Sequence, residues 1–312
     1  MSLLEVDSVH VEYERRGLPP VPAVAGVDLE VGRGQIVALV GESGCGKSTL
    51  ARAVVGLLAP RRGEVRFEGR PVLPVSRGAR PPEQVRLQMI FQDPYSSLNP
   101  RRRVESQILD GQRGLRGSGR RMEAGELLER VGLSPVVAKR YPHEFSGGQR
   151  QRIAIARALA ADPALIVADE PVTSLDASSQ AQVTNLLGAL CREMEMGMLF
   201  ISHDLALVRH VADVVAVMYL GRIVELGPTD DLWEAPMHPY TRALIAAVPV
   251  ADGKRRLPEA LPGEVPDPAR PPVGCRFRPR CPHAFDRCVD EPPLLGVGAR
   301  AAACWLVDEE RR

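Results

Sequence analysis

Short apolar runs rich in β-branched residues recur along the chain and indicate buried strands. Two of them, 36–40 and 164–168, contain only apolar residues, which is typical of parallel strands that are covered on both faces. The run at 214–227 is broken by Leu220-Gly221, which predicts a hairpin that turns at this dipeptide. The remaining strand-like runs lie at 3–13, 24–31, 64–68 and 85–92.

Helical segments separate several of these runs. From residue 164 onward strands and helices alternate, which favours a parallel sheet with right-handed crossovers. We therefore predict an α/β fold. The segments that are expected to be helical are 48–58, 122–133, 238–249 and the segment that SGGQ opens within 141–163.

The composition is that of an ordinary globular protein. Of 312 residues, 45% are hydrophobic, and the formal net charge of +1 gives no reason to expect nucleic-acid binding. The longest apolar stretch, 214–220, is far shorter than the roughly 20 residues that span a bilayer. The N-terminus shows no signal-peptide pattern, so we expect a cytoplasmic protein with reduced thiols. The basic run at 101–103 is either a partner contact or a solvated face.

A glycine-rich loop follows the apolar run at 36–40. Residues 41–48 read GESGCGKS, the G-x-x-x-x-G-K-[ST] pattern of a phosphate-binding P-loop. Its glycines let backbone N–H groups approach phosphate oxygens, and the next helix adds its positive N-terminal end. Lys47 would reach the β- and γ-phosphates, and Ser48 would bind Mg²⁺. The alternative is a glycine-rich turn with a chance Lys-Ser pair.

Two carboxylates end the apolar run ALIVADEP at 164–171. Asp169 suits the acid that holds Mg²⁺ through its water shell, and Glu170 is placed to orient and deprotonate an attacking water. Taken alone, the pair could equally be a helix cap before a proline turn. Downstream of a P-loop, the pair predicts nucleotide hydrolysis.

A second anion-binding helix start is predicted at Ser146-Gly147-Gly148-Gln149. Ser146 is a good N-cap, and the two glycines leave N–H groups at the helix start open to an anion. The helix that follows has Ile153, Ile155 and Leu159 on its apolar face. One nucleotide has no obvious use for two such sites, unless the second serves a nucleotide that another subunit holds.

With these motifs the chain resembles the ATP-binding subunit of ABC transporters. Phe145 stands where that family usually has leucine, a change that keeps an apolar side chain. The motifs occur in the order of the family and are GESGCGKST (Walker A), Gln92 in MIFQDP (Q-loop), FSGGQ at 145–149 (signature), LIVADE (Walker B), SLD at 174–176 (D-loop) and His203 in FISHD (switch histidine).

The resemblance implies a role for each matching residue. Tyr13 stands where the family places an aromatic ring that stacks on adenine, although it could as easily be a strand surface residue. The residues implied in catalysis are Lys47, Gln92, Glu170 and His203, and those implied in Mg²⁺ binding are Ser48, Gln92 and Asp169. The residues implied in ATP binding are Tyr13, Gly41, Glu42, Ser43, Gly44, Cys45, Gly46, Lys47, Ser48, Thr49, Gln92, Ser146, Gly147, Gly148, Gln149, Asp169 and Asp176.

The same resemblance divides the chain into two parts. Residues 1–235 would form an ABC nucleotide-binding cassette, a P-loop NTPase with a RecA-like core, an antiparallel β part and a helical subdomain inserted at about 93–145. Residues 236–312 resemble the C-terminal extension of oligopeptide/dipeptide importers, because HPYT is followed by a proline-rich segment and a cysteine tail. Six prolines in 258–272 indicate an extended linker. PYSSLNPR and SLDASSQAQV resemble the second, F-type ATPase of that branch.

These features predict an ATPase that powers peptide import, bound peripherally at the cytoplasmic face of the cell membrane. Two cassettes would face head to tail. The implied partners are a second ABC ATPase, two transmembrane permease subunits and an extracytoplasmic peptide-binding protein. Alternatives are an importer for glutathione or nickel chelates, an accessory ATPase of a cytoplasmic enzyme complex, and a soluble ABC ATPase of DNA repair or translation. The last is disfavoured because such relatives carry two cassettes or long insertions.

The tail contains four of the six cysteines, in the spacing C-x5-C-x6-C-x15-C. Disulfides are disfavoured in a reducing compartment. Four thiolates, or three with His283, could bind zinc, although structural zinc sites usually contain tighter cysteine pairs. A [4Fe–4S] cluster tolerates wider spacings, and the resemblance favours it because oligopeptide importers with a GCxFxPRC tail are associated with such a cluster. Free thiols in a packed tail are the remaining alternative. The candidate cluster ligands are Cys275, Cys281, Cys288 and Cys304.

Overall fold

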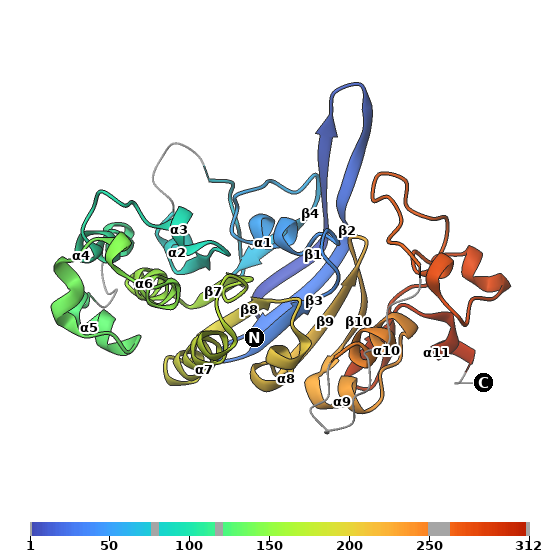
Figure 1. The fold of residues 1–312 in the computed structure, drawn as a ribbon. Helices are drawn as coiled ribbons and strands as arrows, with labels where there is room; N and C mark the ends of the chain where they lie inside the picture. The colour runs from blue at the N-terminus through green and yellow to red at the C-terminus, as the bar shows by residue number, and fades with distance from the viewer. Residues whose placement is uncertain (1, 76–80, 116–120, 249–262, 310–312) are drawn as a thin grey trace.

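The computed structural model describes residues 2–75, 81–115, 121–248 and 263–309. Figure 1 shows two sheets in the centre, a group of helices on one side and the C-terminal residues on the other. The strands are β1 (Ser2–Arg15), β2 (Leu18–Gly32), β3 (Ile36–Val40), β4 (Arg62–Phe67), β5 (Arg70–Pro71), β6 (Leu87–Ile90), β7 (Leu165–Asp169), β8 (Gly197–Ile201), β9 (Val214–Tyr219), β10 (Arg222–Pro228), β11 (Leu295–Val297) and β12 (Arg300–Ala302).

Short and medium helices surround the sheets. In the part of the chain that the structure describes, none has the length and apolar content that crossing a membrane requires. The α-helices are α1 (Lys47–Val54), α2 (Pro82–Val85), α3 (Pro94–Ser97), α4 (Val104–Ile108), α5 (Ala124–Arg130), α6 (Gly147–Leu159), α7 (Ala177–Glu193), α8 (Leu205–Val211), α9 (Thr229–Glu234), α10 (Pro239–Ala246) and α11 (Trp305–Glu309). The 3₁₀ helices are η1 (Leu109–Gly114), η2 (Pro135–Lys139), η3 (Pro142–Glu144), η4 (Arg278–Arg280) and η5 (Asp286–Val289).

The larger sheet has eight strands in the order β11-β12-β10-β9-β3-β8-β7-β6. Strands β9, β3, β8, β7 and β6 pair in parallel, which confirms the predicted parallel sheet. All five residues of β3 are buried, and they alternate between two cores. Ile36, Ala38 and Val40 pack with residues of α6, α7 and α8, whereas Val37 and Leu39 pack toward α1 and the second sheet. Two covered faces explain why this strand contains only apolar residues.

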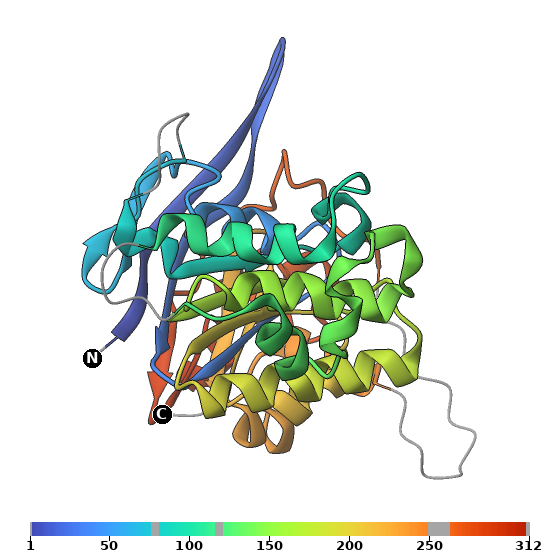
Figure 2. The ribbon, with the colours of Figure 1, turned by 90° about the vertical axis from the view of Figure 1, so that its left-hand side faces the viewer.

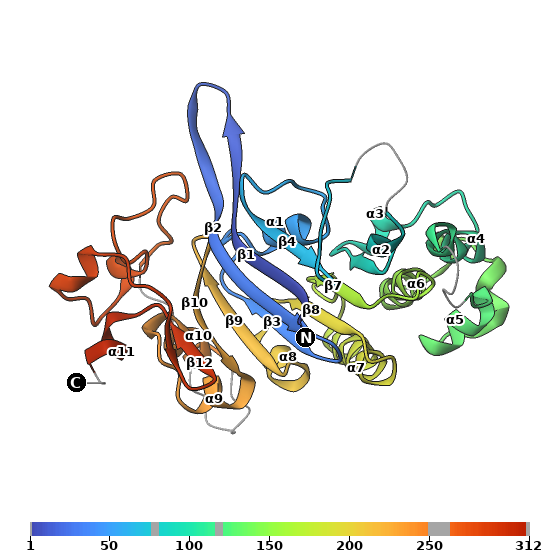
Figure 3. The ribbon, with the colours of Figure 1, turned by 180° about the vertical axis from the view of Figure 1, so that it is seen from behind.

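The second sheet is antiparallel and has the order β2-β1-β4-β5. Strands β1 and β2 form a long hairpin that projects from the body of the molecule (Figure 3). The predicted strand at 24–31 is therefore too short, because β2 begins at Leu18. Residues 18–20 are exposed on the projecting arm and carry no apolar pattern for a sequence analysis to find.

The predicted hairpin at 214–227 is present as β9 and β10. Leu220 and Gly221 have φ angles of 42° and 82°, which is the conformation of a tight turn with both central residues in the left-handed region. The predicted strand at 85–92 shrinks to β6, because residues 82–85 form the short helix α2.

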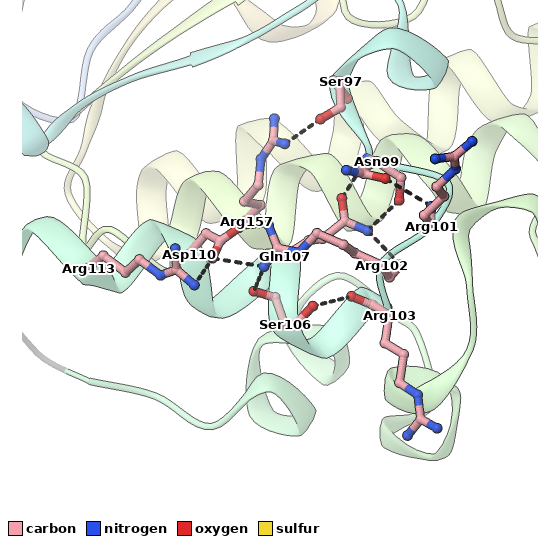
Figure 4. A network of polar contacts seen from close by, with 10 residues as sticks. All are labelled: Ser97, Asn99, Arg101, Arg102, Arg103, Ser106, Gln107, Asp110, Arg113 and Arg157. Carbon is pink, nitrogen blue, oxygen red and sulfur yellow. Dashed lines mark hydrogen bonds and ion pairs between the residues drawn. The ribbon is translucent and has the colours of Figure 1, made fainter. Parts of the chain in front are cut away.

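The helices between β6 and β7 form a separate layer at one side of the sheet (Figure 2). Val104, Ile108 and Leu127 are buried in the same core as Ile153 of α6. The basic run at 101–103 does not behave as a uniform solvated face. Figure 4 shows Arg102 bonded through both terminal nitrogens to the Asp110 carboxylate, at 2.5 and 3.1 Å, whereas its two neighbours are exposed. This partly exposed ion pair joins the residues before α4 to the 3₁₀ helix η1, eight positions further along the chain.

The C-terminal residues pack against the sheet instead of forming a detached appendage. Strand β12 pairs with β10, so the tail extends the larger sheet. Phe277 is buried in the core that contains Tyr219 and Tyr240. The predicted linker at 258–272 lies partly outside the described residues, and its described part, 263–272, contains neither helix nor strand. The division of the chain at 235/236 stays a prediction.

Candidate functional site

The predicted P-loop connects the end of β3 to the start of α1. Gly41 and Gly46 have φ angles of 151° and 107°, which L-residues rarely adopt. A Cβ at Gly41 would lie 2.1 Å from the carbonyl oxygen of Met218, and one at Gly46 would lie 2.0 Å from that of Ala23. The two glycines therefore fix the path of the loop, and residues 43–44 are exposed at its tip.

Lys47 is buried inside this loop, with a relative exposure of 4%. Its ammonium donates hydrogen bonds to the carbonyl oxygens of Gly41, at 2.8 Å, and Glu42, at 3.0 Å. The sulfur of the buried Cys45 lies 3.8 Å from the same nitrogen. The loop thus encloses the lysine head group in a position set by backbone carbonyls.

Ser48 and Asp169 come together from α1 and the end of β7. The Ser48 hydroxyl donates to Asp169 Oδ1 at 2.9 Å, and burial raises the pKa of the Asp169 carboxyl. One hydroxyl and one carboxylate fit Mg²⁺, which usually takes few protein ligands when a nucleotide supplies phosphate oxygens. The Tyr13 hydroxyl lies 3.2 Å from Thr49 Oγ1, so the ring of Tyr13 stands beside the P-loop helix.

Glu170 follows directly and has a φ angle of 46°, a strained backbone conformation for this residue type. Three side chains contact one oxygen of its carboxylate, Oε2. They are Gln92 Nε2 at 3.0 Å, Thr173 Oγ1 at 3.1 Å and His203 Nδ1 at 3.4 Å. The structure therefore brings together Gln92, Glu170 and His203, three of the residues implied in catalysis. Sequence analysis missed Thr173, whose only signal was its place three residues after the glutamate.

The signature residues begin α6. Ser146 and Gln149 form a capping box, in which the serine hydroxyl accepts from the Gln149 N–H at 3.3 Å and the Gln149 side chain accepts from the Ser146 N–H at 3.1 Å. Asp176 caps α7 by accepting from the Ser179 N–H at 3.0 Å, and that bond lowers the pKa of the Asp176 carboxyl. The helix start belongs to the helical layer, to one side of α1 in Figure 1.

The four tail cysteines meet at one small pocket, which is also lined by His283. All four are free thiols. Burial raises the pKa of three of them, that of Cys304 to about 11, and the proximity of the other thiols adds to the effect. In the described part of the chain, however, no group of three or more His, Cys, Asp or Glu side chains could hold a metal ion. The expected cluster is thus not supported by a formed metal site.

Comparisons with known proteins identify two family regions. Residues 24–173 match the ABC transporter model, and residues 224–288 match the model of the oligopeptide/dipeptide transporter C-terminal region. The chain is 50% identical to a probable peptide ABC transporter ATP-binding protein of Sinorhizobium fredii, over 98% of this chain and 90% of that protein. It is 47% identical to the oligopeptide transport ATP-binding protein OppF of Escherichia coli, over 98% and 96% of the two chains.

Solved structures that resemble this fold are ATP-binding cassettes. A subunit of the cbiONQ ABC transporter complex of Clostridium perfringens has a TM-score of 0.64 at 26% identity, covering 75% of this chain and 91% of that one. A dimeric cassette in a post-hydrolysis state, bound to ADP and phosphate, has a TM-score of 0.62 at 26% identity, covering 72% and 98%. These likenesses agree with the P-loop architecture described above.

Proposed function

The chain belongs to the ABC transporter family, in the branch of oligopeptide/dipeptide transport ATP-binding proteins, and we propose that it powers peptide uptake as the F-type ATPase of such an importer. It is an ATPase, as its family implies. The observation that carries the proposal is the convergence of Gln92, Thr173 and His203 on Glu170, next to the Ser48–Asp169 pair.

Some residues of the site bind the nucleotide, and others take part in its hydrolysis. Lys47 and the N–H groups of the P-loop bind the triphosphate, and Tyr13 stacks on the adenine. Mg²⁺, held by Ser48, Asp169 and Gln92, would supply positive charge against the phosphate oxygens. Since Gln92 and Thr173 donate to Oε2 of Glu170 and His203 lies beside it, Oε1 is the oxygen that accepts a proton from the attacking water.

A complete site requires two cassettes. Ser146, Gly147, Gly148 and Gln149 of one cassette contact the nucleotide held by the P-loop of the other, with Asp176 at the junction. The start of α6 supports this assignment because Gly147 and Gly148 lie in its first turn, where the positive end of the helix favours an anion. A solved cassette with the same fold is dimeric. The second cassette is a partner ATPase of similar size.

Peptides are the proposed cargo because curated relatives at 46–50% identity are named for peptide transport. The chain binds peripherally at the cytoplasmic face of the membrane, on two permease subunits that receive peptides from an extracytoplasmic binding protein. Residues 1–235 form the ATPase cassette, with 93–145 as its helical subdomain, and residues 236–312 form the extension.

Reconstitution with two permease subunits and a partner ATPase tests this function. Peptides added with the binding protein should stimulate ATP hydrolysis, and Glu170→Gln should reduce that hydrolysis to background while ATP binding persists. Glu195→Gln, at an exposed position, is the control and should keep the wild-type rate. Wild-type hydrolysis by Glu170→Gln would refute the role of Glu170. Stimulation by glutathione or nickel chelates, but not by peptides, would change the cargo.

Within this function we infer that Cys275, Cys281, Cys288 and Cys304 bind a [4Fe–4S] cluster that cross-links the extension. The support is that all four thiols line one pocket, where burial, and after it the neighbouring thiols, raise the pKa of Cys304 and disfavour its thiolate unless a cation compensates. Anaerobically purified protein should be brown and contain about four irons per chain. Colourless protein with one zinc per chain would replace the cluster with zinc and leave the ATPase assignment intact.

A further inference from the structure

Three groups of the P-loop residue Glu42 form hydrogen bonds, namely its N–H, its carboxylate and its carbonyl oxygen. The first two of these groups bond to residues in the C-terminal part of the chain. Its N–H donates to the Tyr240 hydroxyl at 2.9 Å. Its carboxylate accepts from both terminal nitrogens of Arg280, at 2.7 and 3.0 Å. Its carbonyl oxygen accepts from the Lys47 ammonium at 3.0 Å. Glu42 therefore connects the phosphate-binding lysine to two side chains that lie 198 and 238 positions after Glu42 in the sequence.

The Arg280 guanidinium is almost inaccessible to solvent. Its side chain is 3% exposed, and its carbon lies 5.8 Å from the ring centre of Tyr219 and 5.9 Å from that of Phe277. Nη1 also lies 3.4 Å from the Tyr219 hydroxyl. The bidentate bond with Glu42 raises the pKa of Arg280 above its ordinary value, so this arginine stays charged.

Aromatic packing fixes the direction from which Arg280 approaches. The ring of Phe277 stands edge-on to that of Tyr219, with centres 5.4 Å apart, and Tyr240 lies 4.7 Å from Tyr219. Phe277 is the residue just before the short helix η4, which Arg280 ends. The rings therefore anchor η4 against the sheet beside the P-loop, and the guanidinium has little freedom to leave the carboxylate.

Loss of the Arg280–Glu42 ion pair would affect phosphate binding in two ways. The Glu42 carboxylate, 22% exposed, would keep its negative charge without its cationic partner, next to the loop that receives a triphosphate. The backbone of Glu42, whose carbonyl oxygen orients Lys47, would lose the restraint that the side-chain bonds provide and keep the Tyr240 bond at its N–H. Both changes weaken phosphate binding and leave the water-activating group at Glu170 untouched.

We propose that Arg280 is a positioning residue of the ATP site, which reaches from the C-terminal extension to neutralise Glu42 and fix the peptide that orients Lys47. The inference rests on the proposed function, because it assumes that the P-loop binds ATP. It assigns to the extension a direct part in nucleotide binding.

The test is a double-mutant cycle on the full-length chain, with Arg280→Met and Glu42→Gln measured singly and together, and with the dissociation constant for a fluorescent ATP analogue and Mg²⁺ as the readout. Arg280→Met should bind at least about tenfold more weakly than wild type, which corresponds to about 1.4 kcal/mol. Arg280→Lys should lie between the two, since one ammonium cannot replace the bidentate fork. Arg278→Met, an exposed arginine of the same turn, is the control and should bind like wild type.

Coupling to Glu42 separates positioning from general destabilisation. The double variant Arg280→Met with Glu42→Gln should bind more tightly than Arg280→Met alone, because the unpaired carboxylate has been removed. If Arg280→Met does not fold, Arg280→Lys with and without Glu42→Gln gives the same comparison. Wild-type affinity in the Arg280 variants, or no recovery in the double variant, would overturn the proposal. A wild-type chain that binds no ATP would instead overturn the proposed function, and this inference with it.

Discussion

At the scale of single residues, the site depends on side chains that converge on one carboxylate oxygen. Glu170 has a strained backbone, and its Oε2 is contacted by side chains from three separate segments. Such convergence leaves the carboxylate one orientation, which a general base needs before water arrives. Residues that only hold Glu170 should therefore change the rate of hydrolysis without changing ATP affinity.

Thr173→Val tests this expectation, because valine keeps the shape of threonine and removes the hydroxyl that contacts Glu170 at 3.1 Å. We expect kcat to fall by roughly threefold to tenfold, the effect of one lost hydrogen bond, with an unchanged KM for ATP. Thr173→Ser, which keeps the hydroxyl, should restore the rate. Steady-state ATPase measurements on the assembled transporter give both constants. An unaltered kcat in Thr173→Val would show that the hydroxyl does not orient Glu170.

Lys47→Arg should not act as a conservative change. The loop encloses a compact ammonium between the two carbonyl oxygens that orient it, and a planar guanidinium does not fit the same space. We expect ATP binding to weaken at least about tenfold. Lys139→Arg, at an exposed position, should leave the dissociation constant unchanged. Near-normal affinity of Lys47→Arg in an equilibrium titration would show that Lys47 lies outside the phosphate site.

At the scale of elements, the start of α10 depends on a histidine that is buried and neutral. The side-chain Nδ1 of His238 accepts from the backbone N–H of Tyr240 at 3.0 Å, and the backbone N–H of His238 donates to the Glu225 carboxylate at 2.8 Å. Burial lowers the pKa of His238 to about 3. This cap also places Tyr240, whose hydroxyl accepts from the P-loop.

The lowered pKa predicts that acid destabilises the fold through His238. As the pH falls below about 6.5, the unfolded chain binds a proton that the folded chain excludes, so the free energy of unfolding falls. Between pH 7.5 and 5.5, wild type should lose about 1.4 kcal/mol more than His238→Asn, whose amide still caps the helix. His210→Asn, at an exposed site, should follow wild type. Urea unfolding at both pH values measures the difference, and equal losses in wild type and His238→Asn would contradict it.

At the scale of the whole molecule, the P-loop and the signature lie on different parts of one chain. The P-loop leads into α1 in the centre of Figure 1, whereas the signature starts α6 within the helical layer. An arrangement of this kind suits a site that two cassettes complete together. Activity should then depend on association as well as on the residues of one chain.

The isolated chain should accordingly hydrolyse ATP slowly. Addition of the partner ATPase and permease subunits should raise the rate per chain, and dilution below the dissociation constant of the assembly should lower it. Size-exclusion chromatography at each concentration provides the control for the state of assembly. Full activity in a sample that is monomeric throughout would contradict a shared site.

Local sequence was sufficient for the elements that local chemistry specifies. Sequence predicted the strand at 36–40, the P-loop and the turn at Leu220-Gly221. A strand covered on both faces requires a run of apolar residues, and tight loops with positive φ angles favour glycine. The family region was recognisable for the same reason, since its motifs are short and ordered.

Only the tertiary structure decided the contacts that join distant segments. Strands β11 and β12 have three residues each, too few for a periodic signal, and they exist because β10 offers an edge. The Glu42–Arg280 pair joins residues 238 positions apart. The sequence around Glu42 or Arg280 does not predict that the two residues pair. The direction of the arginine is set by the packing of Phe277 against Tyr219. Sequence thus determined which groups could bind a nucleotide, and the fold determined which distant side chains support them.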